Sequence, residues 1–109
     1  MFKKLQKKLE SVTSNLRKLK KINQYVVIGY PKENEIINHP SYAIKIGVSG
    51  EGNVEVSIDG GDWKSCRQAE SFWWYDWANY PSGTHKIIVR LRDNKGKVIK
   101  KSEIRRCTS

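Results

Sequence analysis

The stretch VEVSIDGGDW, residues 54–63, decides the fold class. Its first five residues alternate strictly, with Val54, Val56 and Ile58 on one side and polar residues on the other, which is the period of a half-buried β-strand. The next four residues, DGGD, are typical of a tight hairpin turn because glycine readily takes the positive φ that such turns need. We therefore expect a strand followed by a hairpin here.

Alternation and turns of the same kind recur on both sides of this stretch. Further strands are expected in YVVIGYP (25–31), YAIKIGV (42–48), WKSCR (63–67), FWWYDW (72–77), HKIIVRLRD (85–93) and VIKKSEIRRC (98–107), with a bridging strand at 36–37. Turn residues lie at the junctions and no helical pattern separates the strands, so an architecture of alternating strands and helices is excluded. The sequence predicts an all-β sandwich of about seven antiparallel strands for residues 24–109.

Six aromatic residues fall within FWWYDWANY, residues 72–80. On a strand, alternate side chains point to opposite faces. One face is expected to fill the core, and it carries Trp73, Tyr75 and Trp77. The other face carries Phe72, Trp74 and Asp76. Because Asp76 favours solvent, Trp74 is expected to be exposed beside it. The expectation for such a residue is packing against a neighbouring subunit or the N-terminal helix. The alternative is contact with a glycan or a protein partner, for which Trp74, Phe72 and Asp76 are the candidate residues.

Trp63 directly follows the DGGD turn. We expect it to fold over the end of the sandwich, and it is a weaker candidate for partner contact. Four arginines lie in the last two predicted strands: Arg90, Arg92, Arg105 and Arg106. If these strands pair, the four side chains form a solvated basic face.

Residues 1–23 have a different pattern. Their apolar residues follow at steps of three and four, close to a heptad repeat: Phe2, Leu5, Leu9, Val12, Leu16, Leu19 and Ile22. Eight basic residues and one acidic residue give positions 1–22 a net charge of +7 out of the chain's +10. The segment is predicted to be a basic amphipathic α-helix that acts as a tether or oligomerises.

Three uses of this helix stay open. It can form a homo-oligomer through a short coiled coil, dock onto another protein of an assembly, or lie on an anionic membrane surface. Nucleic acid is not expected as a partner, because the lysines come without base-stacking aromatic residues. The rest of the chain has a net charge of only +3, since +10 less +7 leaves +3.

The two cysteines, Cys66 and Cys107, either form a disulfide bond or remain two unreactive thiols, because the sequence does not determine the strand order. A disulfide would indicate an extracellular or surface location, and free thiols a cytoplasmic one. No signal peptide or transmembrane segment is recognised. His39 and His85 stand alone, so neither a metal site nor a cofactor is expected.

Three motifs together suggest a known family: VEVSIDGGDW, the alternating aromatic strand Trp73–Tyr75–Trp77, and PSGTHKIIVRLRDNKGK at 81–97. They resemble the second half of bacterial immunoglobulin-like domains and are similar to the sandwich appended to sulfite-oxidase-type molybdoenzymes. The resemblance is good over residues 53–97 and implies an immunoglobulin-like or fibronectin-III-like antiparallel β-sandwich. Such domains serve as spacers, adhesins, sugar binders and dimerisation modules.

No nucleophile–base pair, paired carboxylates or phosphate-binding loop is recognised, so the chain is not expected to be an enzyme. We expect a structural or interaction module that is presented on an assembly helix, as in an extracellular or virion-like surface subunit. The alternatives are a carbohydrate-binding module that uses Trp74 and a protein attached to the membrane surface through its helix.

Overall fold

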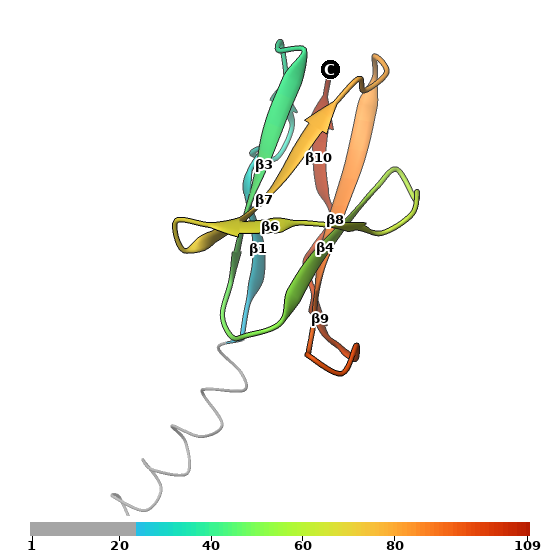
Figure 1. Cartoon of the computed structure of the whole chain (residues 1–109). Coiled ribbons are helices and arrows are strands. Elements are labelled where there is room, and N and C mark those ends of the chain that lie inside the picture. The colour runs from blue at the N-terminus through green and yellow to red at the C-terminus, as the bar shows by residue number, and fades with distance from the viewer. Residues whose placement is uncertain (1–23) are drawn as a thin grey trace, which may run out of the picture.

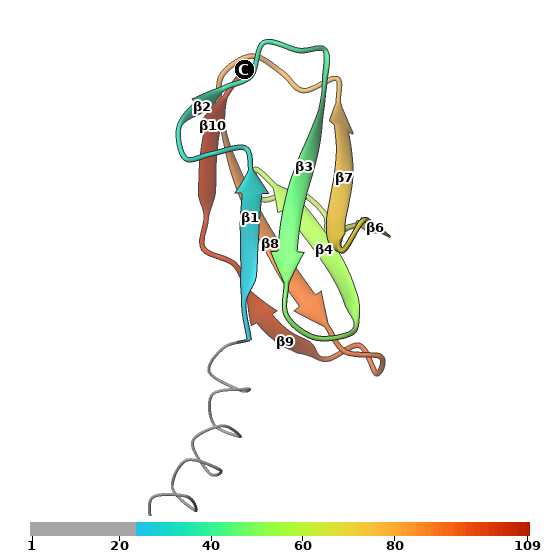
Figure 2. The same ribbon diagram turned by 90° about the vertical axis from the view of Figure 1, so that its left-hand side faces the viewer.

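The computed structural model describes residues 24–109, and the predicted helix over residues 1–23 lies outside the described residues. The described chain forms ten strands in two sheets that pack face to face (Figure 1, Figure 2). The strands are β1 (Val26–Tyr30), β2 (Glu35–Ile36), β3 (Ser41–Val48), β4 (Asn53–Ile58), β5 (Lys64–Ser65), β6 (Arg67–Ala69), β7 (Phe72–Ala78), β8 (Thr84–Arg92), β9 (Val98–Lys101) and β10 (Arg105–Thr108). Among the described residues, no helix is long and apolar enough to cross a membrane.

The first sheet has the strand order β1-β3-β7-β6 and the second has the order β2-β10-β8-β4-β5. Strand β9 also belongs to the second sheet, because it pairs with the second half of β8 while β10 pairs with the first half. The strand pairs are antiparallel apart from β2 with β10, which is parallel. The prediction of an all-β sandwich is confirmed.

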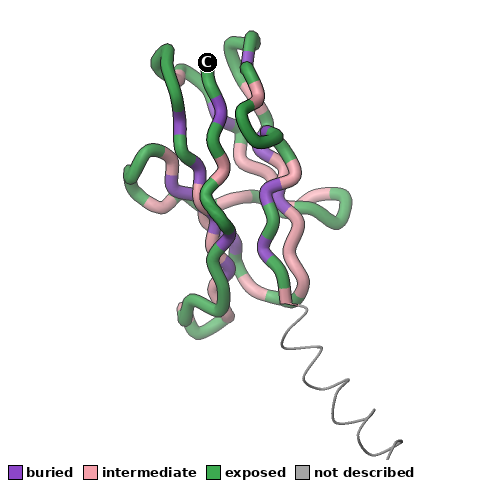
Figure 3. The backbone as a smooth tube through the Cα atoms, turned by 180° about the vertical axis from the view of Figure 1, so that it is seen from behind, coloured by how far each residue is buried: buried purple, intermediate pink, exposed green. Residues whose placement is uncertain are grey.

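The core lies between the two sheets, at the positions that the alternation predicts. Along β8 every second residue is buried, from His85 to Leu91. The other strands complete the core with Val26, Ile28, Ile44, Ile46, Val54, Val56 and Trp77. Figure 3 shows that the buried positions lie along the strands and that the connecting loops are mostly exposed. Trp73 and Tyr75 are half-buried and pack against this core, as predicted.

The predicted strand at 63–67 is divided between the two sheets. Its first part is β5, which pairs with β4 in the second sheet, and its last part begins β6, which pairs with β7 in the first. At the crossing, the Cys66 N–H donates to the Val54 carbonyl at 2.9 Å, the last contact with β4 before the chain changes sheets. The chain therefore passes from the second sheet to the first at Cys66.

The predicted strand at 98–107 is also divided, at residues 102–104. Ser102 replaces regular pairing here: its N–H donates to the Val89 carbonyl at 2.7 Å, and its hydroxyl accepts from the Val89 N–H at 2.9 Å. The interruption separates β9 from β10 and lets both pair with β8.

Cys66 and Cys107 are free thiols in this fold. Cys66 directly follows β5, and three strand-to-strand steps separate β5 from β10 in the sheet order. At about 4.8 Å a step the strands lie roughly 14 Å apart, whereas bridged cysteines need Cα atoms within about 7 Å. The disulfide alternative is therefore wrong, and the cysteines give no argument for an extracellular location.

Candidate functional site

The outer side of the first sheet carries a cluster of large exposed side chains, which we call the aromatic face. It consists of Tyr25, Val27, Tyr30, Phe72 and Trp74, arranged around Lys45 and Gly47. Cross-strand register places these residues together: Tyr30 and Trp74 both lie opposite Lys45, and Val27 lies opposite Gly47. The exposed fractions of Tyr25, Val27 and Tyr30 are 49%, 48% and 45%. The structure thus places Phe72 and Trp74 on an outer face, as predicted, although Trp74 is half-buried rather than exposed. It also adds the neighbours Tyr25, Val27 and Tyr30, which the sequence did not indicate.

Lys45 lies among the rings of this face. Its Nζ atom is 4.0 Å from the centre of the Phe72 ring, 5.8 Å from that of Trp74 and 5.9 Å from that of Tyr30. These are cation–π distances, so the ammonium group can stay charged while its chain fills space between the aromatic side chains. Lys32 adds a second cation, 4.7 Å from the Tyr30 ring centre. The aromatic face is therefore apolar with a positive rim.

Trp74 and Asp76 already have partners within the domain. The Trp74 indole N–H donates to the Ala69 carbonyl at 3.0 Å, and its ring meets Phe72 edge-on at 6.4 Å between centres. Asp76 accepts two hydrogen bonds from Arg67, at 2.8 and 3.0 Å. These bonds lower the pKa of Asp76 and raise that of Arg67. Asp76 is therefore not a free carboxylate beside Trp74.

Trp63 lies on the outer side of the second sheet rather than over the end of the sandwich. Its ring stacks on Arg90, with 4.0 Å between the guanidinium carbon and the ring centre. Arg90 in turn donates to Glu55 at 2.8 Å. This stack is on the opposite layer from the aromatic face, so Trp63 does not join the other predicted contact residues.

The four arginines of the last strands form two groups instead of one basic face. Arg90 and Arg92 share Glu55, with nearest approaches of 2.8 and 3.4 Å. The other pair, Arg105 and Arg106, lies within 3.7 Å of Glu33. The separation arises because β9 and β10 pair with different halves of β8.

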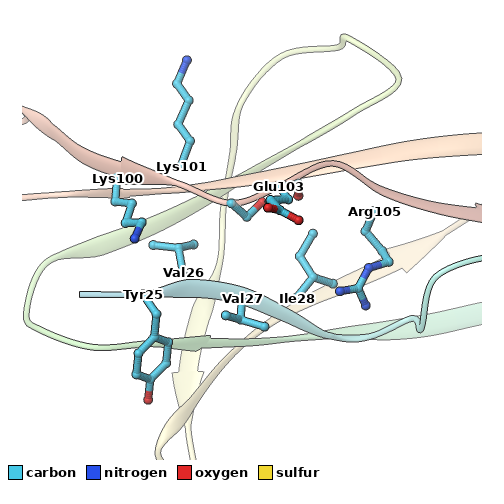
Figure 4. Close-up of a pocket in the computed structure, with 9 residues that line it drawn as sticks. Tyr25, Val26, Val27, Ile28, Lys100, Lys101, Glu103 and Arg105 are labelled. Carbon is cyan, nitrogen blue, oxygen red and sulfur yellow. The ribbon is translucent and has the colours of Figure 1, made fainter. Parts of the chain in front are cut away.

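A groove of about 270 Å³ runs between the edge strand β1 and the β9–β10 junction (Figure 4). Val26 and Ile28 point toward it, while Tyr25 and Val27 point to the other side. Lys100 donates to the Gln24 carbonyl at 2.6 Å, and Arg105 donates to the Pro31 carbonyl at 2.7 Å. Basic side chains that cover an edge strand oppose pairing with foreign strands. We therefore interpret the groove as a protected edge.

His85, 2% exposed, organises the other end of the sandwich. Its Nδ1 lies 2.7 Å from Asp59, and its Nε2 lies 2.8 Å from both the Pro81 carbonyl and the Ser109 hydroxyl. Asp59 also accepts from the Lys86 N–H at 2.8 Å. The network connects the β4–β5 turn, the β7–β8 connection and the end of β10.

Ser109, His85 and Asp59 have the spacing of a hydrolytic triad, which the sequence analysis did not anticipate. The hydrogen bonds do not suit that chemistry. The Pro81 carbonyl, which can only accept, lies as close to Nε2 as the Ser109 hydroxyl does. The Ser109 hydroxyl already donates to the same carbonyl at 2.7 Å. The cluster is therefore structural. Within residues 24–109, no three His, Cys, Asp or Glu side chains gather closely enough to hold a metal ion.

Burial keeps both thiols protonated. It raises the pKa of Cys66 to about 12, with a smaller contribution from Glu55, and the pKa of Cys107 to about 11, with smaller contributions from Asp59 and other carboxylates. A thiol in an unfolded chain has a pKa of about 8.5. The stability that the buried thiols provide is therefore complete below pH of about 8.5 and is lost as the pH rises toward 11 to 12.

We expect neither cysteine to react with Ellman's reagent in the native protein at pH of about 8, because the thiolate is the reactive form. Unfolding in guanidinium chloride should release both of the chain's 2 thiols. The absorbance of the thionitrobenzoate released from the reagent measures the number of reactive thiols in the native and the unfolded protein. Rapid reaction of one thiol in native buffer would contradict the raised pKa values.

The chain matches no protein-family model and no curated protein. Among solved structures it is similar to the fibronectin(III)-like modules of Clostridium thermocellum CbhA, with a TM-score of 0.61 and 23% identity over 77% of this chain and 94% of that chain. It is also similar to an engineered protein, with a TM-score of 0.61 and 15% identity over 78% of this chain and 20% of that one. The described residues have a fibronectin III-like fold.

This result confirms the predicted immunoglobulin- or fibronectin-III-like sandwich. At these identities the likeness shows the fold alone, and the link to sulfite-oxidase-type enzymes stays a prediction.

Proposed function

We propose that this chain is a non-catalytic interaction module whose aromatic face contacts a protein partner. The observation that carries the proposal is the gathering of exposed aromatic side chains on one side of one sheet. Tyrosine, tryptophan and phenylalanine are enriched at protein interfaces, and contiguous apolar surface of this kind marks interaction sites. Because Lys32 and Lys45 add positive charge to this face, the partner that fits it best has an apolar surface with acidic groups.

We further propose that residues 1–23 hold the module in an assembly. Their predicted apolar stripe ends at Ile22, and Gln24 leads directly to Tyr25 on the aromatic face. Two to three heptads are marginal as an isolated helix, so a contribution from the sandwich would favour association. A second copy of the chain is the first partner to test.

A glycan platform at Trp74 is less well supported. Sugar stacking needs an open aromatic ring, whereas the Lys45 ammonium lies 4.0 Å from the centre of the Phe72 ring and 5.8 Å from that of Trp74. Membrane attachment depends on residues 1–23 alone and stays a prediction.

Light scattering of the full chain tests the assembly role. We expect a mass that rises with concentration to a defined oligomer, and Leu9→Asp or Leu16→Asp should weaken association at least tenfold, about 1.4 kcal/mol. Val27→Lys should weaken it if the aromatic face takes part, and Ile36→Lys, at a position 68% exposed on β2, is the matched control. A wild-type monomer at every concentration would contradict the assembly role. Oligomers that are unaffected by Val27→Lys would show that the aromatic face does not take part in self-association, and its partner would then be a different protein.

A further inference from the structure

The sandwich has a cleft whose chemical character differs from that of the aromatic face. It is a cleft of about 330 Å³ between the β4–β5 turn and the β7–β8 connection. Its apolar part is formed mainly by the half-buried rings of Tyr75 and Tyr80, because Trp77, which also lines it, is only 7% exposed. Its rim is formed by Asp62, Lys64 and Asn79. Tyr75 and Trp77 belong to the inward side of β7, so the cleft is an opening of the sandwich interior rather than part of an outer face.

The polar groups around this cleft fall into two classes. Asp59, His85 and Tyr80 are fully engaged: Asp59 and His85 bond each other, and the Tyr80 hydroxyl donates to the His39 carbonyl. By contrast, the side chains of Asp62, Lys64 and Asn79 have no hydrogen bond or ion pair within residues 24–109. The first class fixes the shape of the cleft, and the second is free to bind.

The aromatic wall is held in place by ring contacts. Trp77 and Tyr80 lie 4.4 Å apart between centres, and His85 meets Trp77 edge-on at 5.0 Å. A preformed aromatic surface with a few unpartnered polar groups is the usual composition of a small-molecule site. The volume is near the lower limit of the roughly 300–1,000 Å³ typical of such sites, which favours a ligand of small cross-section.

We propose that this cleft binds a neutral saccharide. The C–H face of a sugar ring packs on an aromatic wall, and its hydroxyl groups need both donors and acceptors. The rim offers both, as a carboxylate, an ammonium group, an amide and the Tyr75 hydroxyl. Asp62 and Lys64 balance in charge, so the rim selects neither an anion nor a cation. The proposal is independent of the protein-binding role of the aromatic face.

Isothermal titration of the full chain with cellohexaose, xylohexaose, mannohexaose and chitohexaose tests this site. We expect at least one of them to bind at concentrations up to about 10 mM. Asp62→Ala, Asn79→Ala and Tyr75→Phe should each weaken that binding about tenfold, the effect of one lost hydrogen bond. Glu51→Ala, an exposed acidic residue of the β3–β4 turn, is the matched control and should leave binding unchanged.

Two results would overturn the proposal. One is the absence of binding by all four hexasaccharides. The other is binding that is lost in Trp74→Ala and retained in Asp62→Ala, because it would place the saccharide on the aromatic face. Asp62 and Asn79 are exposed, so their variants should fold, and circular dichroism checks this.

Discussion

Replacing Gly52 with alanine is expected to destabilise the sandwich by about 3 kcal/mol or more, a large part of the stability of a domain of this size. Gly52 has a φ of +142° and directly precedes β4. A Cβ atom there would lie 2.0 Å from the Arg92 carbonyl oxygen and 3.1 Å from its carbon. Since backbone cannot rotate aside as a side chain can, β4 would have to shift away from β8 at their first paired residues, Asn53 and Arg92.

Gly50 is the matched control for this substitution. It also has a positive φ, +108°, but a Cβ atom there would meet nothing within 4 Å. Gly50→Ala should therefore lose only the conformational preference of glycine, about 1 kcal/mol. Urea unfolding of the full chain, followed by tryptophan fluorescence, measures both variants. Equal losses for the two would show that the close approach to Arg92 is not the cause.

Replacing His85 with alanine is expected to destabilise the protein by about 3 kcal/mol, which lowers Tm by about 15 °C. The substitution removes the bonds to Asp59, Pro81 and Ser109 and leaves a cavity beside Trp77. Asp59 is 43% exposed at its side chain and can regain water, which limits the loss. Three segments lose their common contact, so the effect should exceed that of a typical surface substitution.

His39→Ala is the control, because His39 is exposed and holds Tyr80 only through its backbone carbonyl. Its cost should stay within about 0.5 kcal/mol. Calorimetry of the full-length variants gives both values. A His85→Ala protein as stable as His39→Ala would mean that the buried network contributes little.

The sequence allowed prediction of those features of the fold that depend on the local alternation of apolar and polar residues. Strand β8 buries the residues that a period of two assigns, and the turns lie at the glycine-rich junctions. Strand β4 does so at Val54 and Val56, but Ser57 is also buried, where its hydroxyl donates to the Gly61 carbonyl, and Ile58 is only half-buried. Membership of a sheet is different, because it depends on partners far along the chain. The division of residues 63–67 at Cys66 follows from pairing with β4 on one side and β7 on the other, and no local pattern indicates that change.

The aromatic face shows why the candidate site was only partly predictable. Phe72 and Trp74 follow from alternation on one strand, but Lys45 joins them through register between strands. The outward position of Tyr30 depends on an irregularity in β1. Counting by twos from Val26 and Ile28 would turn Tyr30 inward, yet a bulge between Ile28 and Tyr30 brings it outward, opposite Lys45. The burial of His85 follows from its phase with Ile87 and Val89 on β8, whereas its partners Asp59 and Ser109 are 26 and 24 residues away.

Strand β7 serves both proposed binding surfaces, since Phe72 and Trp74 face outward and Tyr75 and Trp77 face the cleft. An insertion or deletion of one residue within β7 would exchange the two sets of side chains at once. The two surfaces can therefore diverge independently only by substitution. In evolutionary terms, length changes should be excluded from the strand itself and from the β7–β8 connection, where Tyr80 bonds His39 and Pro81 bonds His85.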